Sequence, residues 1–182
     1  MRSNSIGVQR YAKELIKIKE NAMDARRSID PIDRALLRAL YANARASGSA
    51  LSREARVAES TVALRLKRLR DDGYLRGYHA DINVEALGMT VQALISVQLV
   101  KHVRADVDAF RRAAPAWPGV LAFFHTGGSD DYLLHVAADS ATGLRDFVIT
   151  HLADHPAVSH TETNLVFEHV VGSGLDELLS SR

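Results

Sequence analysis

The stretch that decides the fold of the N-terminal half is ESTVALRLKRLRDDGYLRGY, residues 59–78. Its apolar residues Val62, Leu66 and Leu69 recur at helical spacing, which predicts a helix over 59–72 with one buried stripe. Gly73 predicts a left-handed helix end, and the alternation over 74–78 predicts a short wing strand. The face opposite the buried stripe is basic through its middle, and with its margins it holds Ser60, Thr61, Leu64, Lys67, Arg68 and Asp71.

Two shorter helices are expected before this one. Asp30 is an N-cap candidate, Pro31 suits the first turn, and Asp33 complements the positive end of the helix dipole, so a helix is expected from here to about Ala44. Ser49 is the expected cap of a second helix that ends near residue 56. Apolar residues at helical spacing in the two segments are Ile32, Leu36, Leu37, Leu40, Leu51 and Ala55. Three helices in close succession predict a winged helix-turn-helix domain over residues 29–80.

The charge of the chain is divided between its two halves. Residues 1–86 hold 17 Lys and Arg against 11 Asp and Glu, a net charge of +6, whereas residues 87–182 hold 6 against 11, a net charge of −5. Phosphates attract a basic surface through counterion release and repel an acidic one. We therefore expect the N-terminal half to bind a polyanion such as double-stranded DNA.

The composition excludes several classes of chemistry. The chain has no cysteine, so it has no disulfide, no thiolate metal site and no cysteine nucleophile. With 47% hydrophobic and 25% charged residues it is typical of a globular protein. No stretch approaches the roughly 18 apolar residues of a membrane span, and no signal peptide is evident. We expect a soluble, cytoplasmic protein without a cofactor.

The second half changes from helical to strand-like periodicity. Apolar runs at 91–100, 120–125, 132–138 and 158–170 alternate with helix patterns at 105–114 and 142–153. This order predicts a ferredoxin-like βαββαβ domain, so the whole chain is expected to be an α+β protein. One sheet face needs cover, and the strand residues Ile95, Val97, Leu99, Leu165 and Phe167 suggest an apolar patch through which two chains dimerise.

The expected organisation has five parts. Residues 1–28 form a basic helical extension, which either is solvated, packs on a partner or lies on DNA, and residues 29–80 form the helix-turn-helix domain. Residues 81–89 are a linker, residues 90–171 are the dimerisation domain, to which the family resemblance described next adds effector sensing, and residues 172–182 are a tail.

From Ile29 to about Val171 the sequence resembles the Lrp/AsnC family of feast/famine transcriptional regulators. The similar pieces in the first domain are residues 29–37, Ala44-Arg45, 65–69, 73–75 and Gly77-Tyr78; those in the second domain are Thr126-Gly127, 131–136 and 161–163. The resemblance implies a DNA-binding regulator whose DNA binding or oligomeric state responds to a small-molecule effector, here an amino acid. It also implies homodimers that assemble into a higher oligomer, such as an octamer.

The resemblance and the residue types together suggest two sites. The helix over 59–72 is expected to enter the major groove, with small residues at base edges and basic residues at phosphates. The expected DNA-binding residues are Ser60, Thr61, Ala63, Leu64, Lys67, Arg68 and Arg76, while Arg65 is expected in an internal ion pair. An effector site between the second domains of an oligomer is implied at Thr126, Gly127, Gly128, Asp130, Asp131 and Thr163. Gly and Asp there also fit a plain tight hairpin.

The sequence departs from the family pattern at Arg56 and Ala58, where the family tends to have Gly and a Ser N-cap. The hairpin loop 126–131 also looks one residue longer than the family's turn.

Alternative interpretations stay open. His151 and His155, at i and i+4, could share a metal with Asp154, although a polar helix face is commoner. Trp117 is expected to be a packing anchor. Siroheme decarboxylases resemble the same two-domain family, so the histidines of the second half keep an enzyme possible. An architectural DNA-binding protein without effector is a further alternative.

Overall fold

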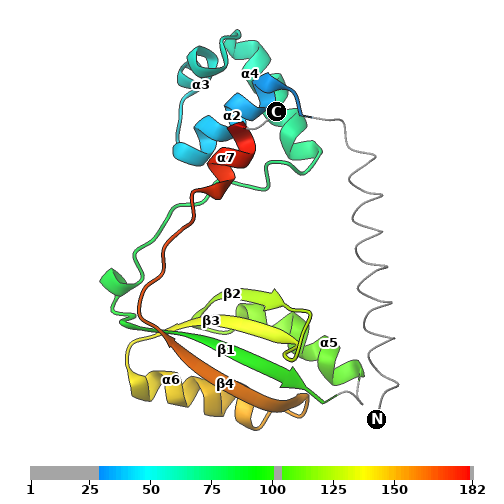
Figure 1. Cartoon of the computed structure of the whole chain (residues 1–182), viewed down its shortest axis with the longest axis vertical. Coiled ribbons are helices and arrows are strands. Elements are labelled where there is room, and N and C mark those ends of the chain that lie inside the picture. Colours follow the sequence, from blue (N-terminus) through cyan, green and yellow to red (C-terminus); the bar gives the residue numbers. More distant parts are fainter. Residues whose placement is uncertain (1–28, 101–103, 181–182) are drawn as a thin grey trace. The chain divides into compact units, whose positions relative to one another are not determined.

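The structure is a computed structural model, and it describes residues 29–100 and 104–180. The chain divides into two compact units (Figure 1). The first, called the DNA-binding unit after the role that its sequence predicts, comprises residues 29–81 and 171–180 of the described chain. The second, called the ligand-binding unit after its expected role, comprises the described residues between 82 and 170. The basic extension expected over residues 1–28 lies outside the described residues. Within the described part, no helix is long and apolar enough to cross a membrane.

Three helices form the centre of the DNA-binding unit: α2 (Pro31–Ala42), α3 (Gly48–Ala55) and α4 (Glu59–Asp71). Helix α2 begins as predicted, because the Asp30 side chain accepts a hydrogen bond from Asp33 N–H while the Asp33 side chain accepts one from Asp30 N–H. The predicted inward positions are confirmed for Leu36, Leu40, Leu51, Ala55 and Val62, which one small core buries. Ile32 and Leu66 pack against this core and are partly buried, whereas Leu37 is half-buried and lies outside it. Leu69 of α4 is also fully buried.

Two local predictions in this unit were wrong. The N-cap of α3 is Ser47, whose hydroxyl accepts from Ala50 N–H; Ser49 lies inside the helix, where its hydroxyl is within hydrogen-bonding distance of the Ser47 hydroxyl. Residues 74–78 form no strand, although Gly73 has the predicted positive φ of 76°. A strand needs a neighbour to pair with, and the described residues of this unit offer none.

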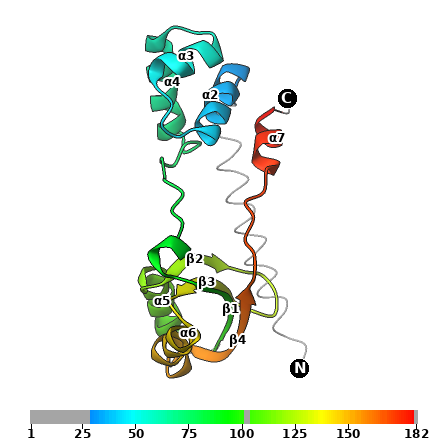
Figure 2. The same ribbon diagram turned by 90° about the vertical axis from the view of Figure 1, so that its left-hand side faces the viewer.

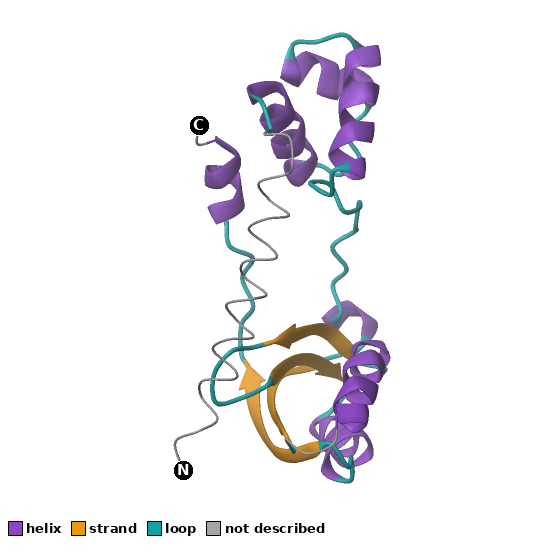
Figure 3. Cartoon of the chain, turned by 90° about the vertical axis from the view of Figure 1, so that its right-hand side faces the viewer, coloured by secondary structure: helices purple, strands orange, loops and turns teal. Residues whose placement is uncertain are grey.

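The C-terminal segment, expected to be a tail, contains a further helix. Helix α7 (Gly174–Ser180) packs on α2 and belongs to the DNA-binding unit, and Figures 2 and 3 show the two helices side by side. Helices α2 and α7 are more than a hundred residues apart in sequence, so the periodicity within 172–182 could not reveal that they pack together.

The ligand-binding unit has the predicted strand and helix order. Strands β1 (Val91–Leu99), β2 (Val120–His125), β3 (Tyr132–Ala138) and β4 (Val158–Val166) form one sheet of order β2-β3-β1-β4, in which every pairing is antiparallel. Helix α5 (Arg104–Ala113) precedes β2, and α6 (Ala141–Val148), extended by a π-helical turn (Ile149–Ala153), precedes β4. A short 3₁₀ turn (Glu85–Leu87) lies before β1. Figure 3 shows the curved sheet with its helices on one face.

The core of this unit lies between the sheet and the helices and is aromatic at its centre. Phe110 of α5 is fully buried, with its ring 5.5 Å from those of Trp117 and Tyr132 and 6.1 Å from that of Phe123. Trp117 also stacks on His151 at 4.7 Å. Trp117 is therefore the packing anchor that its position between two prolines suggested.

The open face of the sheet carries different residues from those expected. Ile95, Val97 and Leu99 are buried on the helix side, and Phe167 lies beyond the end of β4. Leu165 pairs with Ala93, so it occupies a helix-side position at the sheet edge, where it is half exposed. The opposite face, by strand register, includes Leu94, Leu133, Phe124, Gln92, Ser96, His135, Glu162 and Asn164. Alternate residues of a strand face opposite sides of a sheet, and the prediction placed the wrong alternate set of β1, that of Ile95, Val97 and Leu99, on the open face.

Candidate DNA-binding interface

The candidate interface is built on α4 and the turn that precedes it. Arg56 ends α3 in the left-handed region, with φ 54° and ψ 43°, so the strained turn that the missing Gly suggested is present. Ala58 is the N-cap of α4 and makes no side-chain capping hydrogen bond. The turn is instead braced by Ser52, whose hydroxyl donates to the Val57 carbonyl.

The face of α4 that points away from the core is exposed. Ser60, Ala63, Leu64 and Lys67 are all exposed, and Leu64 leaves 70% of its surface accessible. Thr61 is half-buried, and Arg76, in the segment after the helix, is exposed. The Lys67 ammonium lies 2.6 Å from the Asp71 carboxylate one turn on, and both side chains are well exposed. Such a surface pair contributes little to stability, so it leaves the Lys67 ammonium available to a phosphate.

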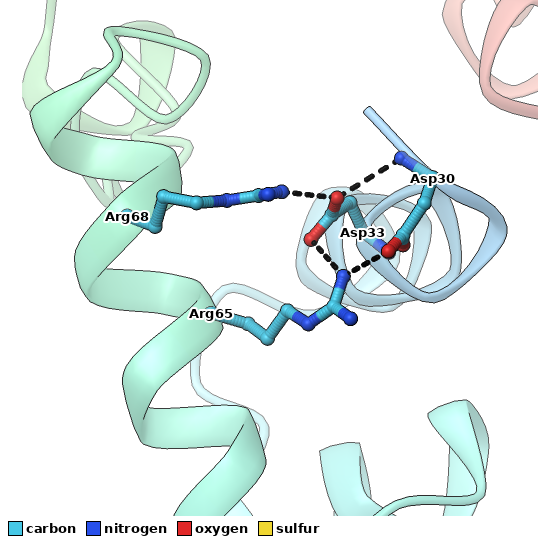
Figure 4. Close-up of polar contacts among 4 residues, drawn as sticks. All are labelled: Asp30, Asp33, Arg65 and Arg68. Carbon is cyan, nitrogen blue, oxygen red and sulfur yellow. Dashed lines mark hydrogen bonds and ion pairs between the residues drawn. The ribbon is translucent and has the colours of Figure 1, made fainter. Parts of the chain in front are cut away.

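The two arginines on the flank of α4 are held by α2 (Figure 4). The Asp33 carboxylate is fully buried and accepts hydrogen bonds from Arg65, at 3.2 Å, and from Arg68. Arg65 also donates to Asp30. The internal role expected for Arg65 is thus confirmed, whereas Arg68, expected at DNA phosphates, has an internal partner. Arg68 sits one turn from Arg65, so it lies close enough to α2 to share the same carboxylate.

The electrostatics of this cluster favour its charged form. Burial by itself would raise the pKa of Asp30, but hydrogen bonds from Arg65 and from Asp33 N–H, together with the Arg65 charge, hold it below its ordinary value. Hydrogen bonds to Asp30 and Asp33 raise the pKa of Arg65. Two carboxylates and two guanidiniums therefore fix the orientation of α4 on α2.

The sequence contained a signal for the cluster. Asp33 shares the α2 stripe of Leu36 and Leu40 at i+3 and i+7, so a carboxylate occupies a core-facing position. A buried charge needs partners, and Arg65 and Arg68 are spaced i, i+3 on the other long helix.

The residues proposed for an effector lie mostly in the β2–β3 turn. Thr126 N–H donates to the Asp131 carbonyl at 3.0 Å and its hydroxyl donates to the Asp130 carbonyl at 2.7 Å, which closes the turn. The carboxylate of Asp131 accepts from Leu99 N–H at 2.8 Å, and that of Asp130 accepts from the Gln98 amide at 3.1 Å. One oxygen of each carboxylate is therefore already used to fix the turn against β1.

Two further features of the ligand-binding unit bear on the expected sites. Thr163 lies on β4, two strands away from β3, and pairs with Ile95, so one protomer does not bring it to the turn. Gly127 and Gly128 are exposed, and a Cβ added to either would meet nothing within 4 Å.

His151 stacks on Trp117 and His155 packs edge-on against Phe110. In the described ranges no three His, Asp or Glu side chains cluster as a metal site.

Comparison with known proteins gives two family matches along the chain. Residues 29–76 match a winged helix-turn-helix DNA-binding model, and residues 92–175 match the model of the Lrp/AsnC ligand binding domain.

Among its relatives, the chain is 39% identical over 147 residues to the HTH-type transcriptional regulator AldR of Mycolicibacterium smegmatis, covering 81% of this chain and 86% of the relative. It is 30% identical over 148 residues to the leucine-responsive regulatory protein of Rhizobium meliloti, covering 81% and 95%. The crystal structure of transcriptional regulator NMB0573 from Neisseria meningitidis, an L-Met complex, has a TM-score of 0.72 at 30% identity and covers 80% of this chain and 94% of that one. These relatives are named as transcriptional regulators, not as enzymes. The chain therefore belongs to the Lrp/AsnC family of DNA-binding transcriptional regulators, with a helix-turn-helix and a ligand-binding domain.

Proposed function

We propose that the chain binds specific DNA sequences through the exposed face of α4 and that an amino acid effector modulates this binding. The observation that carries the proposal is that face itself, since Ser60, Ala63, Leu64 and Lys67 are exposed on the third helix of a helix-turn-helix. In this proposal Ser60, Thr61, Ala63 and Leu64 meet base edges and thymine methyl groups. Lys67 and Arg76 contact phosphates, and Arg68 reaches one only by competing with Asp33.

The test is a set of salt titrations with a duplex from the promoter region of the protein's own gene. Lys67→Ala should weaken binding to all duplexes and lower the salt slope by about 0.9, because one phosphate contact is lost. Ser60→Ala should change the sequence preference and leave the slope unchanged. Arg111→Ala, which removes an exposed arginine of the ligand-binding unit, is the matched control and should change neither. An unaltered slope for Lys67→Ala contradicts the assignment.

The effector proposal takes its support from the ligand-binding domain match and from the β2–β3 turn. Exposed backbone N–H groups at Gly127 and Gly128 suit a carboxylate, and the free oxygens of Asp130 and Asp131 suit an ammonium. Thr126 lies at the mouth of this turn, and Thr163 would join from a second protomer. An amino acid carries both charged groups, and the relative in the L-Met complex binds one.

Calorimetry with the twenty amino acids tests this proposal. At least one should bind, and Gly128→Val should abolish that binding without unfolding the turn, since the added side chain meets open space in the free protein. Gly172→Val, in equally open surroundings outside the ligand-binding unit, is the control. Binding by none of the twenty contradicts the effector. It would favour an effector-independent DNA-binding protein, in which Asp130 and Asp131 serve only to hold the turn.

We also propose that two chains pair through the open sheet face and that such dimers assemble further. Leu94, Leu133 and Phe124 share this face, and Phe124 is 49% exposed. Phe124→Glu should shift sedimentation toward the monomer. Ile149→Glu, at a residue of matching 50% exposure in the helical layer, should leave the oligomer intact. Equal behaviour of the two variants contradicts pairing through this face.

A further inference from the structure

The outer face of α2 contacts the C-terminal helix. Arg34, Arg38 and Tyr41 recur at i, i+4 and i+7, so they share one face of α2, which differs from the core stripe of Leu36 and Leu40. All three reach the C-terminal segment 172–180. An entire helix face is thus directed at a part of the chain more than a hundred residues away in sequence.

The polar contacts between the two helices are specific. Arg38 donates from Nε to one carboxylate oxygen of Asp176 at 2.7 Å and from Nη2 to the other at 3.3 Å. Arg34 donates to the Leu178 carbonyl at 3.3 Å, and the Tyr41 hydroxyl donates to the Gly172 carbonyl at 3.2 Å. Hydrogen bonding to Asp176 raises the pKa of Arg38. A bidentate arginine–carboxylate pair sets the rotation of α7 as well as its distance from α2.

Apolar side chains line the space beside these contacts. A cleft of about 310 Å³ lies between α2, α7 and the segment that follows α4. Its walls include Leu37, Leu40, Tyr41, Tyr74, Leu175 and Leu179. The core beneath has only a handful of buried apolar residues. A domain of about fifty residues with so small a core gains much from an added helix.

We propose that α7 is an integral helix of the DNA-binding unit, a positioning element that holds α2 and through it α4. The order of contacts supports this role, because Asp176 of α7 holds Arg38 of α2, while Asp33 of α2 holds Arg65 and Arg68 of α4. Helix α2 is thus bound to α7 through an ion pair on one side and to α4 through ion pairs on the other. The DNA-binding unit is therefore discontinuous in sequence, and the chain passes between the two units twice, after Asp81 and after Val170.

Hydrogen exchange tests the docking without any ligand or DNA. Asp176→Arg should speed amide exchange in α2 several-fold, because two arginines would then face each other where the ion pair held α7, and it should leave β1 and β3 unchanged. Glu177→Arg is the matched control: it makes the same charge change at the next residue, which is exposed and forms no ion pair within the described chain. The exchanged pair Arg38→Asp with Asp176→Arg should restore slow exchange. Equal exchange in the Asp176→Arg and Glu177→Arg variants overturns the proposal.

Cross-linking identifies which chain supplies the helix. Because the chain has no cysteine, Leu37→Cys combined with Leu175→Cys places the only two thiols on the two helices, in the walls of the same cleft, and leaves the Arg38–Asp176 pair intact. A short bifunctional maleimide should link them within one chain and give a product of monomer mass. Each single variant should give no such product. A product found only at dimer mass would show that α7 docks on a second copy, which contradicts the proposal.

The effect on DNA binding rests on the proposed function and is measured separately. With a duplex from the protein's own promoter region, the Asp176→Arg variant should bind several-fold more weakly than Glu177→Arg, although both carry the same net charge. If exchange in α2 changes and DNA affinity does not, docking holds and the positioning of α4 fails. If the wild-type chain does not bind the duplex, the proposed function is wrong, whereas the hydrogen-exchange result remains valid.

Discussion

The two units of this chain are stabilised by different means. The ligand-binding unit has a continuous apolar core in which Phe110, Tyr132 and Leu134 lie between sheet and helices. The DNA-binding unit has a small apolar core and, beside it, the buried carboxylate of Asp33 held by two arginines. Among the described residues Asp33 is the buried charged group. Hydrogen bonds to a buried carboxylate are directional, so we infer that the Asp33 cluster helps to fix the orientation in which the DNA-binding unit presents α4.

Removal of the central aromatic ring should have the largest effect. Phe110→Ala should lower the free energy of unfolding of the ligand-binding unit by about 3–5 kcal/mol, because a fully buried ring leaves a cavity. Scanning calorimetry checks this, with Phe167→Ala, at a 97% exposed position, as the control. Equal shifts for the two variants would show that the unit does not depend on this core.

Loss of the buried carboxylate should have the next largest effect and should fall on the other unit. Asp33→Ala removes the carboxylate that Arg65 and Arg68 share, and we expect the free energy of unfolding to fall by about 2–4 kcal/mol. This loss is smaller than for a fully buried ion pair, because both arginines are partly exposed. Asp30→Ala, which removes the half-exposed cap, should cost about 1 kcal/mol. The midpoint of the helical unfolding transition, followed by circular dichroism in denaturant, distinguishes them. A smaller loss for Asp33→Ala than for Asp30→Ala would mean that the cap, and not the cluster, sets stability.

The uncapped start of α4 offers a stabilising change. Ala58→Ser should add about 1 kcal/mol to the DNA-binding unit, because the new hydroxyl accepts from a free N–H of the first turn. Ala63→Ser, in the middle of the same helix, should instead cost up to about 0.5 kcal/mol through lower helix propensity. Thermal unfolding of both variants measures the difference. A decrease for Ala58→Ser would show that the N-cap geometry does not admit the hydroxyl bond.

The smallest effect concerns pH and the ligand-binding unit. Burial, reinforced by the neighbouring His169, lowers the pKa of His135, whose ring lies 2.9 Å from the Gln92 side chain. Burial also lowers the pKa of His151. Below the ordinary histidine pKa of about 6.5, the unfolded chain therefore binds more protons than the folded chain. The stabilisation that comes from the neutral histidines is complete above that pH and falls as the pH drops below it.

Denaturant unfolding between about pH 7.5 and 5.5 measures this dependence. His135→Gln should flatten it, while His160→Gln, at an exposed position on edge strand β4, should not. The effect is modest because the His135 ring is only partly buried. A dependence that His135→Gln leaves intact would assign it to other groups.

The sequence by itself determined helices α2 to α6, the four strands of the sheet and the exposed face of α4 that carries Ser60, Leu64 and Lys67. The periodicity of Val62 and Leu69, the Asp30–Asp33 cap and the alternation of β1 are local features, and each is set by neighbours within a turn or a strand pair. Even the strained turn at Arg56 followed from the absence of a glycine.

Only the tertiary structure decided which distant groups meet. The core-facing Asp33 signalled a charge cluster, but only the tertiary structure shows that Arg68, 35 positions away, reaches it. Arg38 pairs with Asp176 across 138 positions, so the place of α7 could not be inferred from spacing. The choice between the two sheet faces was also tertiary, because both sets of alternate residues in β1 include apolar side chains and only the helices decide which is covered. Local patterns fix the shape of each element, whereas packing decides which of its faces are free to act.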